Sequence, residues 1–129
     1  MPTTLTGEEL RFLTGVLDLA RNGDVEQLRD LLDAGVPAHL TDASGNSLLM
    51  LAAYHRQAAV VQLLLERNAD PERVNDSGQT ALGAAVFRRD EPSVRALLAA
   101  GASPDTGARS ARQVAGFFGL TDMQALLDA

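Results

Sequence analysis

A repeating unit of 33 residues is the feature of this 129-residue chain that most restricts its fold. When residues 42–71 are placed over residues 75–104 without a gap, ten positions carry identical residues, and most of the others are conservative exchanges. An earlier copy aligns at the same shift, and a fourth copy aligns after a deletion of three residues. Periods of this length are typical of repeat architectures, in which each unit buries its apolar side against the next unit.

Each unit predicts two short helices joined by a turn and followed by a loop. Ser47 and Thr80 are N-cap residue types placed directly before stretches rich in Ala and Leu. The second helix carries a Val-x-x-Leu-Leu stripe, which is the spacing of a helix with one apolar side. The second helices end in one common register, at Gly35, Asn68 and Gly101. Gly and Asn tolerate the left-handed conformation found at helix C-termini, which supports the alignment.

These features resemble the ankyrin repeat. That family's pattern is a turn residue and a Gly, then Thr-Pro-Leu-His, a helix of small residues closed by a Gly, a Val-x-x-Leu-Leu helix, and Gly-Ala-Asp. The second unit carries it at residues 42–53, 60–65 and 68–70, and the third unit at residues 78–82 and 97–104. The resemblance covers residues 5–127. It implies an all-α solenoid of stacked helix-turn-helix units with short β-hairpin-like loops.

Two departures from the family pattern bear on stability. The family's His is replaced in every unit, by Leu17, Met50, Gly83 and Gln113. We therefore expect the hydrogen bonds with which that His braces the turn to be absent throughout. The Gly that closes the first helix is retained at Gly23 and Gly119 but is replaced by Arg56 and Arg89 in the middle units. A positive φ at each Arg would cost about 1 kcal/mol, so we expect an array less stable than a consensus one.

Both ends of the array carry signs of capping. Thr6 and Glu9 have the spacing of a capping box, which predicts a first helix that begins there and runs to about Asn22. At the other end, Arg112 and Asp128 occupy positions that are apolar in the preceding units, as expected where no further unit stacks. We expect one ankyrin-repeat domain, complete over residues 1–129, with approximate units at 5–41, 42–74, 75–107 and 108–129.

Composition excludes several classes of function. The chain has no Cys, which removes disulfides, thiolate metal sites and Cys nucleophiles. A net charge of −6 argues against nucleic-acid binding, since that depends on cationic contacts. The sequence contains neither a membrane-spanning stretch nor a signal peptide, so we expect a cytoplasmic protein without a cofactor. All eleven basic residues are Arg, and Ile is also absent, which indicates a GC-rich and bacterial genome.

Candidate catalytic and metal-binding residues are few. His39 and His55 are the two histidines, and neither stands in a catalytic or metal-binding motif. Asp70, Glu72 and Asp76 cluster near one loop but lack the spacing of a calcium loop. We expect these residues to be solvated surface groups, and we expect neither enzymatic activity nor a metal site.

The ends of the first helices suggest a binding surface. In ankyrin proteins these positions line the concave face, where partners usually bind. Four of the five aromatic residues of the chain fall in these two columns. The columns, read through the four units, are Arg21, Asn22, Tyr54, His55, Phe87, Arg88, Phe117 and Phe118. Aromatic residues next to arginines have the composition of a binding hot spot. Arg56 and Arg89 are expected to flank it, and a partner with apolar and acidic side chains would suit it.

Three alternatives stay open at this point. The rings could instead pack between adjacent first helices, and Phe118 could cover the open end of the array. The loop tips offer a second set of small, adaptable contacts: Ala43, Ser44, Asn46, Asp76, Ser77 and Gln79. The leading hypothesis is a non-catalytic module that binds an unidentified partner protein as a monomer. The alternative is a structural protein that dimerises through its C-terminal unit, around Phe117, Phe118 and the last helix.

Overall fold

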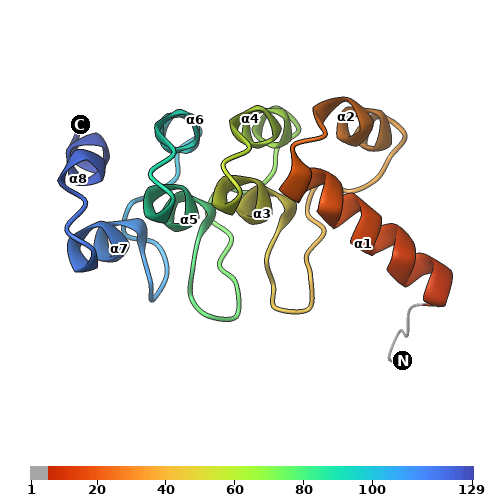
Figure 1. Ribbon diagram of the computed structural model, residues 1–129, viewed down its shortest axis with the longest axis horizontal. Helices are drawn as coiled ribbons and strands as arrows, with labels where there is room; N and C mark the ends of the chain where they lie inside the picture. The colour runs from red at the N-terminus through yellow and green to blue at the C-terminus, as the bar shows by residue number, and fades with distance from the viewer. Residues whose placement is uncertain (1–5) are drawn as a thin grey trace.

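The computed structural model describes residues 6–129, so the expectations for residues 1–5 lie outside the described part of the chain. Within residues 6–129 the chain forms eight helices in four consecutive pairs (Figure 1). Their bounds are α1 Gly7–Asn22, α2 Val25–Asp33, α3 Leu48–Tyr54, α4 Ala58–Glu66, α5 Ala81–Phe87, α6 Glu91–Ala99, α7 Ala111–Phe117 and α8 Thr121–Asp128. The expected all-α solenoid of stacked helix pairs is confirmed.

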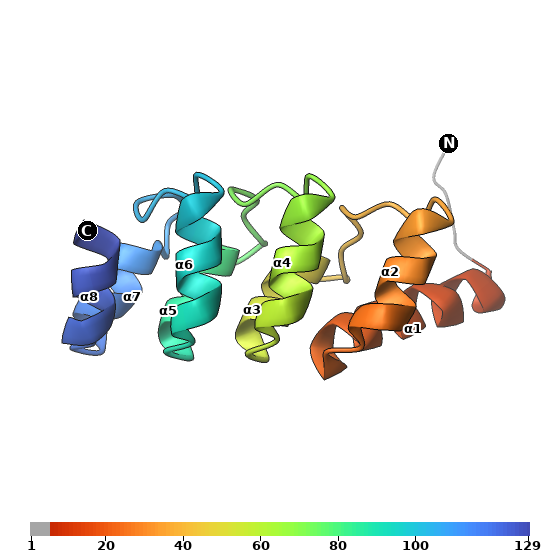
Figure 2. The same cartoon turned by 90° about the horizontal axis from the view of Figure 1, so that it is seen from above.

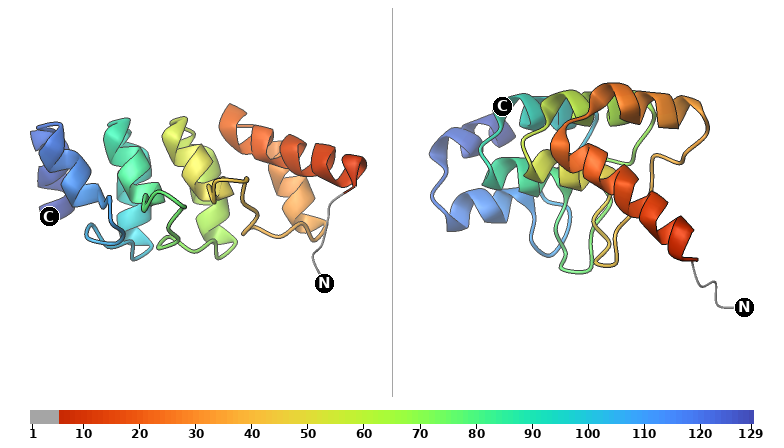
Figure 3. Two further views of the ribbon diagram at one scale, coloured as in Figure 1. Left: turned by 90° about the horizontal axis from the view of Figure 1, so that it is seen from below. Right: turned by 45° about the vertical axis from the view of Figure 1, so that its right-hand side comes forward.

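The helices form two layers with a row of loops beside them. The first helices of the pairs, α1, α3, α5 and α7, pack side by side, and the second helices form a parallel row behind them (Figures 1 and 2). Three loops, here called fingers 1, 2 and 3, precede α3, α5 and α7 and extend from the first-helix side (Figure 3). They comprise residues 41–47, 74–80 and 104–110, and the last finger is visibly the shortest (Figure 1).

Helix starts follow the predicted caps. The hydroxyls of Ser47 and Thr80 accept from the backbone N–H groups three residues ahead, at 3.1 Å each. Thr6 and Glu9 form the predicted capping box, and α1 ends at Asn22 as expected. A second capping box joins Ser110 to Gln113. The expectation that no residue at the family's His position braces the turn was therefore wrong in the fourth unit, because an amide oxygen can accept from the N-cap backbone N–H as Glu does.

Helix ends adopt the left-handed conformation predicted from the repeat. Asn68 has φ 65°, and Gly35 and Gly101 have φ 104° and 95°. Arg56 and Arg89 have φ 60° and 53°, which confirms the positive φ expected of them. An L-residue with a Cβ is strained there by roughly 1 kcal/mol, so the two middle units each carry a local cost.

The core runs through the stack as a continuous layer of small and branched side chains. Ala52 and Ala85 are completely buried where α3 packs against α5. Their small side chains allow the two backbones to approach closely. The second helices contribute the predicted stripe, including Leu64 and Leu97, which are also fully buried. None of the helices between Thr6 and Ala129 has the length and apolar content that spanning a bilayer requires.

The last unit carries polar groups where earlier units carry core residues. Arg112 and Asp128 are exposed and form an ion pair with each other, and Arg112 also bonds Asp105 at 2.8 Å. These hydrogen bonds and the two negative charges raise the pKa of the Arg112 guanidinium above its usual value. Arg112 and Asp128, the two polar residues at positions that are apolar in earlier units, therefore pair with each other on the exposed face of α7 and α8.

Candidate functional site

A groove of about 900 Å³ lies between the first helices and the fingers. It spans all four units, from the end of α1 to the end of α7. Its floor and walls are Arg21, Asp42, Asn46, Met50, Leu51, Tyr54, His55, Gln79, Gly83, Ala84, Phe87, Arg109, Gln113, Val114, Phe117 and Phe118. Most of the lining is apolar, and the polar groups lie mainly on the finger side. Such an arrangement can hold a ligand through apolar contact and orient it by a few polar groups.

The aromatic residues of the groove form a continuous ladder across three units. Tyr54 and Phe87 lie nearly parallel, with their ring centroids 6.3 Å apart and their planes at 10°. Phe87 meets Phe118 edge to face at 5.3 Å, and Phe118 meets Phe117 in the same way at 4.8 Å. His55 lies against Tyr54 at 5.3 Å. These are the offset and T-shaped geometries that aromatic rings prefer.

The ladder is exposed even though its rings touch. Tyr54 and Phe87 keep 44% and 45% of their surface accessible, Phe118 keeps 53% and Phe117 keeps 83%. Neighbouring units therefore share ring contacts without burying the rings. The ladder continues from Phe87 to Phe118, which follows the end of α7, whereas the sequence alignment placed Phe117 in the column of Phe87. Contiguous exposed apolar surface of this kind marks interaction sites in soluble proteins.

Arginines border the ladder, but Arg89 is not one of them. The Arg88 guanidinium lies 5.2 Å from the Tyr54 ring centroid and donates to the Tyr54 backbone carbonyl at 3.0 Å. Arg21 lines the groove and forms an ion pair with Asp18 at 2.6 Å. Arg89, expected to flank the groove, instead forms an ion pair with Asp122 of α8. Arg89 lies in the turn between α5 and α6, and its side chain reaches the next second helix, α8.

Asp42 fixes the first finger. Its carboxylate accepts from the backbone N–H groups of Ser44 and Asn46 and from the Asn46 side-chain amide, at 2.9 to 3.0 Å. Partial burial alone would raise the pKa of the Asp42 carboxyl, but the hydrogen bonds from Asn46 and Ser44 and the charge of Arg21 outweigh it and lower that pKa below its usual value. The carboxylate is thus a structural group whose acceptor positions are largely occupied.

Asn75 does the same in the second finger and joins it to the first. Its amide oxygen accepts from the backbone N–H groups of Ser77 and Gln79, and its amide nitrogen donates to the side-chain oxygens of Asn46 and Gln79. Only 8% of Asn75 is exposed. A backbone bond from Asp76 to Ser44 further connects fingers 1 and 2. The finger side of the groove is therefore held in one shape before any partner binds.

The predicted loop-tip residues divide into two groups. Asn46 and Gln79 line the groove, and the hydrogen bonds of Asp42 and Asn75 hold their side chains. The others lie outside its lining, and all four are exposed at the finger tips: Ala43, Ser44, Asp76 and Ser77. Asn22 is exposed next to the groove and does not line it. Of the predicted loop-tip residues, the structure therefore brings only Asn46 and Gln79 into the groove with the aromatic ladder.

Several groove residues were not singled out from the sequence. Arg109 lines the groove from finger 3. It precedes the N-cap Ser110 just as Asn46 and Gln79 precede theirs, so the repeat alignment contained the signal. Met50 and Gly83 form part of the floor, at the position of the family's His. Away from the groove, the N-terminal half of α1 exposes Leu10 and Phe12, at 53% each.

The chemical groups of the structure give little basis for catalysis or metal binding. His39 is exposed in a loop. The Glu72 carboxylate accepts from the Ser103 backbone N–H at 2.8 Å and from the Thr106 hydroxyl at 2.7 Å, so it joins successive loops. Among residues 6–129, no three His, Asp or Glu side chains lie close enough together to bind a metal ion.

Comparison with known protein families shows to which family the chain belongs. The family profile described as Ankyrin repeats (3 copies) matches residues 17–108. The chain belongs to the ankyrin repeat family. An ankyrin repeat-containing protein of Treponema pallidum is 42% identical over 93 residues, covering 70% of this chain and 31% of that protein. Serine/threonine-protein kinase 12 of Arabidopsis thaliana is 31% identical over 91 residues, covering 70% of this chain and 20% of the kinase.

A solved structure shows the same architecture. The human ASB11 ankyrin repeat domain superposes with a TM-score of 0.78 at 27% sequence identity, covering 88% of this chain and 52% of that one. The chain spans about a third or less of the curated relatives named above. Ankyrin repeats generally mediate protein–protein interaction and are generally non-catalytic, which is the level of function that family membership establishes.

Proposed function

We propose that this ankyrin repeat chain is a non-catalytic binding module that docks a partner protein in its groove, as a regulator or adaptor. The observation that carries the proposal is the exposed aromatic ladder of Tyr54, Phe87, Phe118 and Phe117. Aromatic side chains supply large contact area at low entropic cost and dominate binding energy at interfaces. This proposal includes a cytoplasmic location, expected because the sequence has no membrane-spanning stretch or signal peptide, and a bacterial origin, expected from composition.

Preorganisation of the groove supports the same function. The finger side is fixed by the Asp42 and Asn75 hydrogen bonds, and the floor is formed by helices packed in the core. A partner that binds such a surface loses less free energy to ordering than one that binds a mobile loop. The absence of catalytic activity is part of the proposal, supported by the scattered positions of His39 and the carboxylates.

The proposal is tested by affinity capture from the source organism. Wild-type chain is compared with the Tyr54→Ala/Phe87→Ala double variant, and with Gln62→Ala/Arg95→Ala on the second helices as a matched control. We expect a defined protein to be recovered by the wild type and by the control but not by the groove variant. Equal recovery of every protein by all three forms would contradict the proposal.

Self-association is a second candidate, favoured by the 83% exposure of Phe117 at the end of the stack. In this case the C-terminal unit forms a dimer and the groove stays empty. Multi-angle light scattering across a range of protein concentrations separates the two candidates. A dimer that dissociates on Phe118→Ala would favour self-association, whereas a monomer at all concentrations favours the binding module.

A further inference from the structure

We infer that the groove selects partner segments in which carboxylates flank apolar side chains. This inference rests on the proposed function and adds the chemical class of the partner. It follows from how the arginines of an acidic chain are distributed. The chain as a whole has a net charge of −6, yet Arg88 beside the exposed aromatic ladder and Arg109 in the groove lining form no ion pair within residues 6–129.

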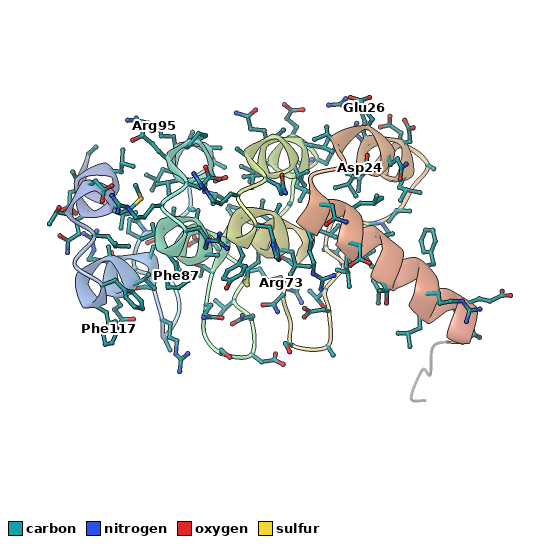
Figure 4. The ribbon with its side chains drawn as sticks, in the orientation of Figure 1. Asp24, Glu26, Arg73, Phe87, Arg95 and Phe117 are labelled. Carbon is teal, nitrogen blue, oxygen red and sulfur yellow. The ribbon has the colours of Figure 1, made fainter. Side chains whose placement is uncertain are left out.

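The eleven arginines divide by position. Six form ion pairs with carboxylates, and three of these lie on the second helices or directly after one: Arg29, Arg67 and Arg95. Within residues 6–129, the arginines without an ion pair are Arg11, Arg56, Arg73, Arg88 and Arg109. Except for Arg11, these lie just after first helices (Arg56 and Arg88), directly before finger 2 (Arg73) or in finger 3 (Arg109). Figure 4 shows Arg73 and Phe87 on the finger side of the molecule and Arg95 on the opposite side.

Arg109 lines the groove, and Arg88 lies at its edge, outside the lining residues but against the Tyr54 ring that lines it. Arg88 lies over the Tyr54 ring and makes one hydrogen bond, to a backbone carbonyl. A guanidinium has five N–H donors, so most of its donors face solvent. Arg109 lines the groove from finger 3, with its backbone N–H bonded to Gly78 and its side chain exposed. The rings of Phe87 and Phe118 line the same groove as Arg109, so a segment bound there can contact apolar and cationic groups together.

In the described part of the chain, residues 6–129, no carboxylate forms an ion pair with either of these two arginines. Asp42 is the one carboxylate among the lining residues, and three hydrogen bonds within finger 1 occupy it. Arg21, at the same end of the groove, is paired with Asp18. The charges at the first unit therefore largely cancel, and the uncompensated positive charge lies beside the ladder in the third and fourth units. Arg binds carboxylates and phosphates in a bidentate manner, and carboxylates are the ones that unmodified protein side chains supply.

A single-stranded nucleic acid also combines negative charge with flat rings, and it stacks on aromatic side chains. The net charge of −6 disfavours it, because affinity for a polyanion depends on many cationic contacts along the backbone. A protein segment needs only one or two carboxylates near Arg88 and Arg109. The observations therefore favour an acidic protein segment.

The test uses a random dodecapeptide library displayed on phage and selected against the whole chain. We expect the selected peptides to be enriched in Asp and Glu next to Leu, Phe or Trp. By fluorescence anisotropy, a selected peptide should bind Arg88→Gln/Arg109→Gln about tenfold more weakly than wild type, since two exposed charge pairs are lost. Arg88→Lys/Arg109→Lys should lose less, and Arg29→Gln/Arg95→Gln should bind as wild type does.

The outcomes separate this inference from the function on which it rests. Peptides that lose affinity on Phe87→Ala but show no acidic enrichment would overturn the inference and leave the groove as the binding site. Peptides that bind Tyr54→Ala/Phe87→Ala as well as wild type would overturn both. A library that yields no acidic groove-binding peptide, or a fifteen-residue oligothymidine that binds more tightly than the selected peptides, would also overturn the inference.

Discussion

Asn75 allows a quantitative test of how firmly the fingers are fixed. Replacement by Ala removes two hydrogen bonds accepted from the backbone N–H groups of Ser77 and Gln79 and two donated to the side chains of Asn46 and Gln79. A hydrogen bond contributes about 0.5–1.5 kcal/mol net. The lower part of that range applies here, because Ser77 and Gln79 are exposed and can turn to water. We expect Asn75→Ala to reduce the free energy of unfolding by about 2–3 kcal/mol.

Asn75→Asp is the matched control. A carboxylate at this position still accepts from Ser77 and Gln79, as Asp42 accepts within finger 1. It no longer donates to the side-chain oxygens of Asn46 and Gln79, but both amides can turn and donate to it instead. Its expected cost is smaller, about 1 kcal/mol. Both values come from urea unfolding followed by circular dichroism, with an unchanged slope as the sign that the native and unfolded states are unaltered in compactness. An Asn75→Ala variant within about 0.5 kcal/mol of wild type would refute the reasoning.

Three further predictions concern backbone strain, pH and the ladder. Arg56→Gly should raise the free energy of unfolding by about 1 kcal/mol in urea titrations, because Gly adopts φ 60° without the Cβ penalty. The pKa of Asp42 is lower in the folded than in the unfolded protein. Its contribution to stability is therefore present above the unfolded pKa and is lost as pH falls through the folded pKa. The melting temperature of Asp42→Asn should accordingly depend less on pH in this acidic range than that of the wild type. Phe87→Ala, at a side chain that is 45% exposed, should lower the free energy of unfolding by about 1 kcal/mol or less, whereas Leu82→Ala, at a fully buried side chain, should lower it by about 3 kcal/mol. Similar losses for the two variants in urea unfolding would show that the ladder is part of the core.

The helical framework was accessible from the sequence because each boundary depends on local chemistry. A hydroxyl at Ser47 or Thr80 caps the residues that follow it, and Gly or Asn adopts a left-handed turn with little strain. The 33-residue period then places every unit in the same register. Even the unfavourable φ values of Arg56 and Arg89 follow from that register, because the stack imposes the backbone of the neighbouring units on them.

The site was less predictable because it depends on where side chains point after stacking. The alignment gives Phe117 the column of Phe87, but the ring that meets Phe87 belongs to Phe118. Arg89 was expected near the ladder, and it pairs with Asp122 of the next unit. Such pairings depend on distances between units, which a repeat pattern does not specify. Arg109 could have been predicted to line the groove, because it precedes its N-cap residue just as Asn46 and Gln79 do. It was missed because an Arg side chain differs in chemistry from the two amides.

The most direct test of the binding function is crosslinking from defined positions within living cells. A photoreactive benzoylphenylalanine is introduced at Phe87 in the groove and, in a second variant, at Gln62 on the outer helix α4. We predict that Phe87 yields a covalent adduct with one protein, identified by mass spectrometry and reproduced with that purified protein, and that Gln62 does not. The same adducts from both positions, or none from Phe87, would contradict the account.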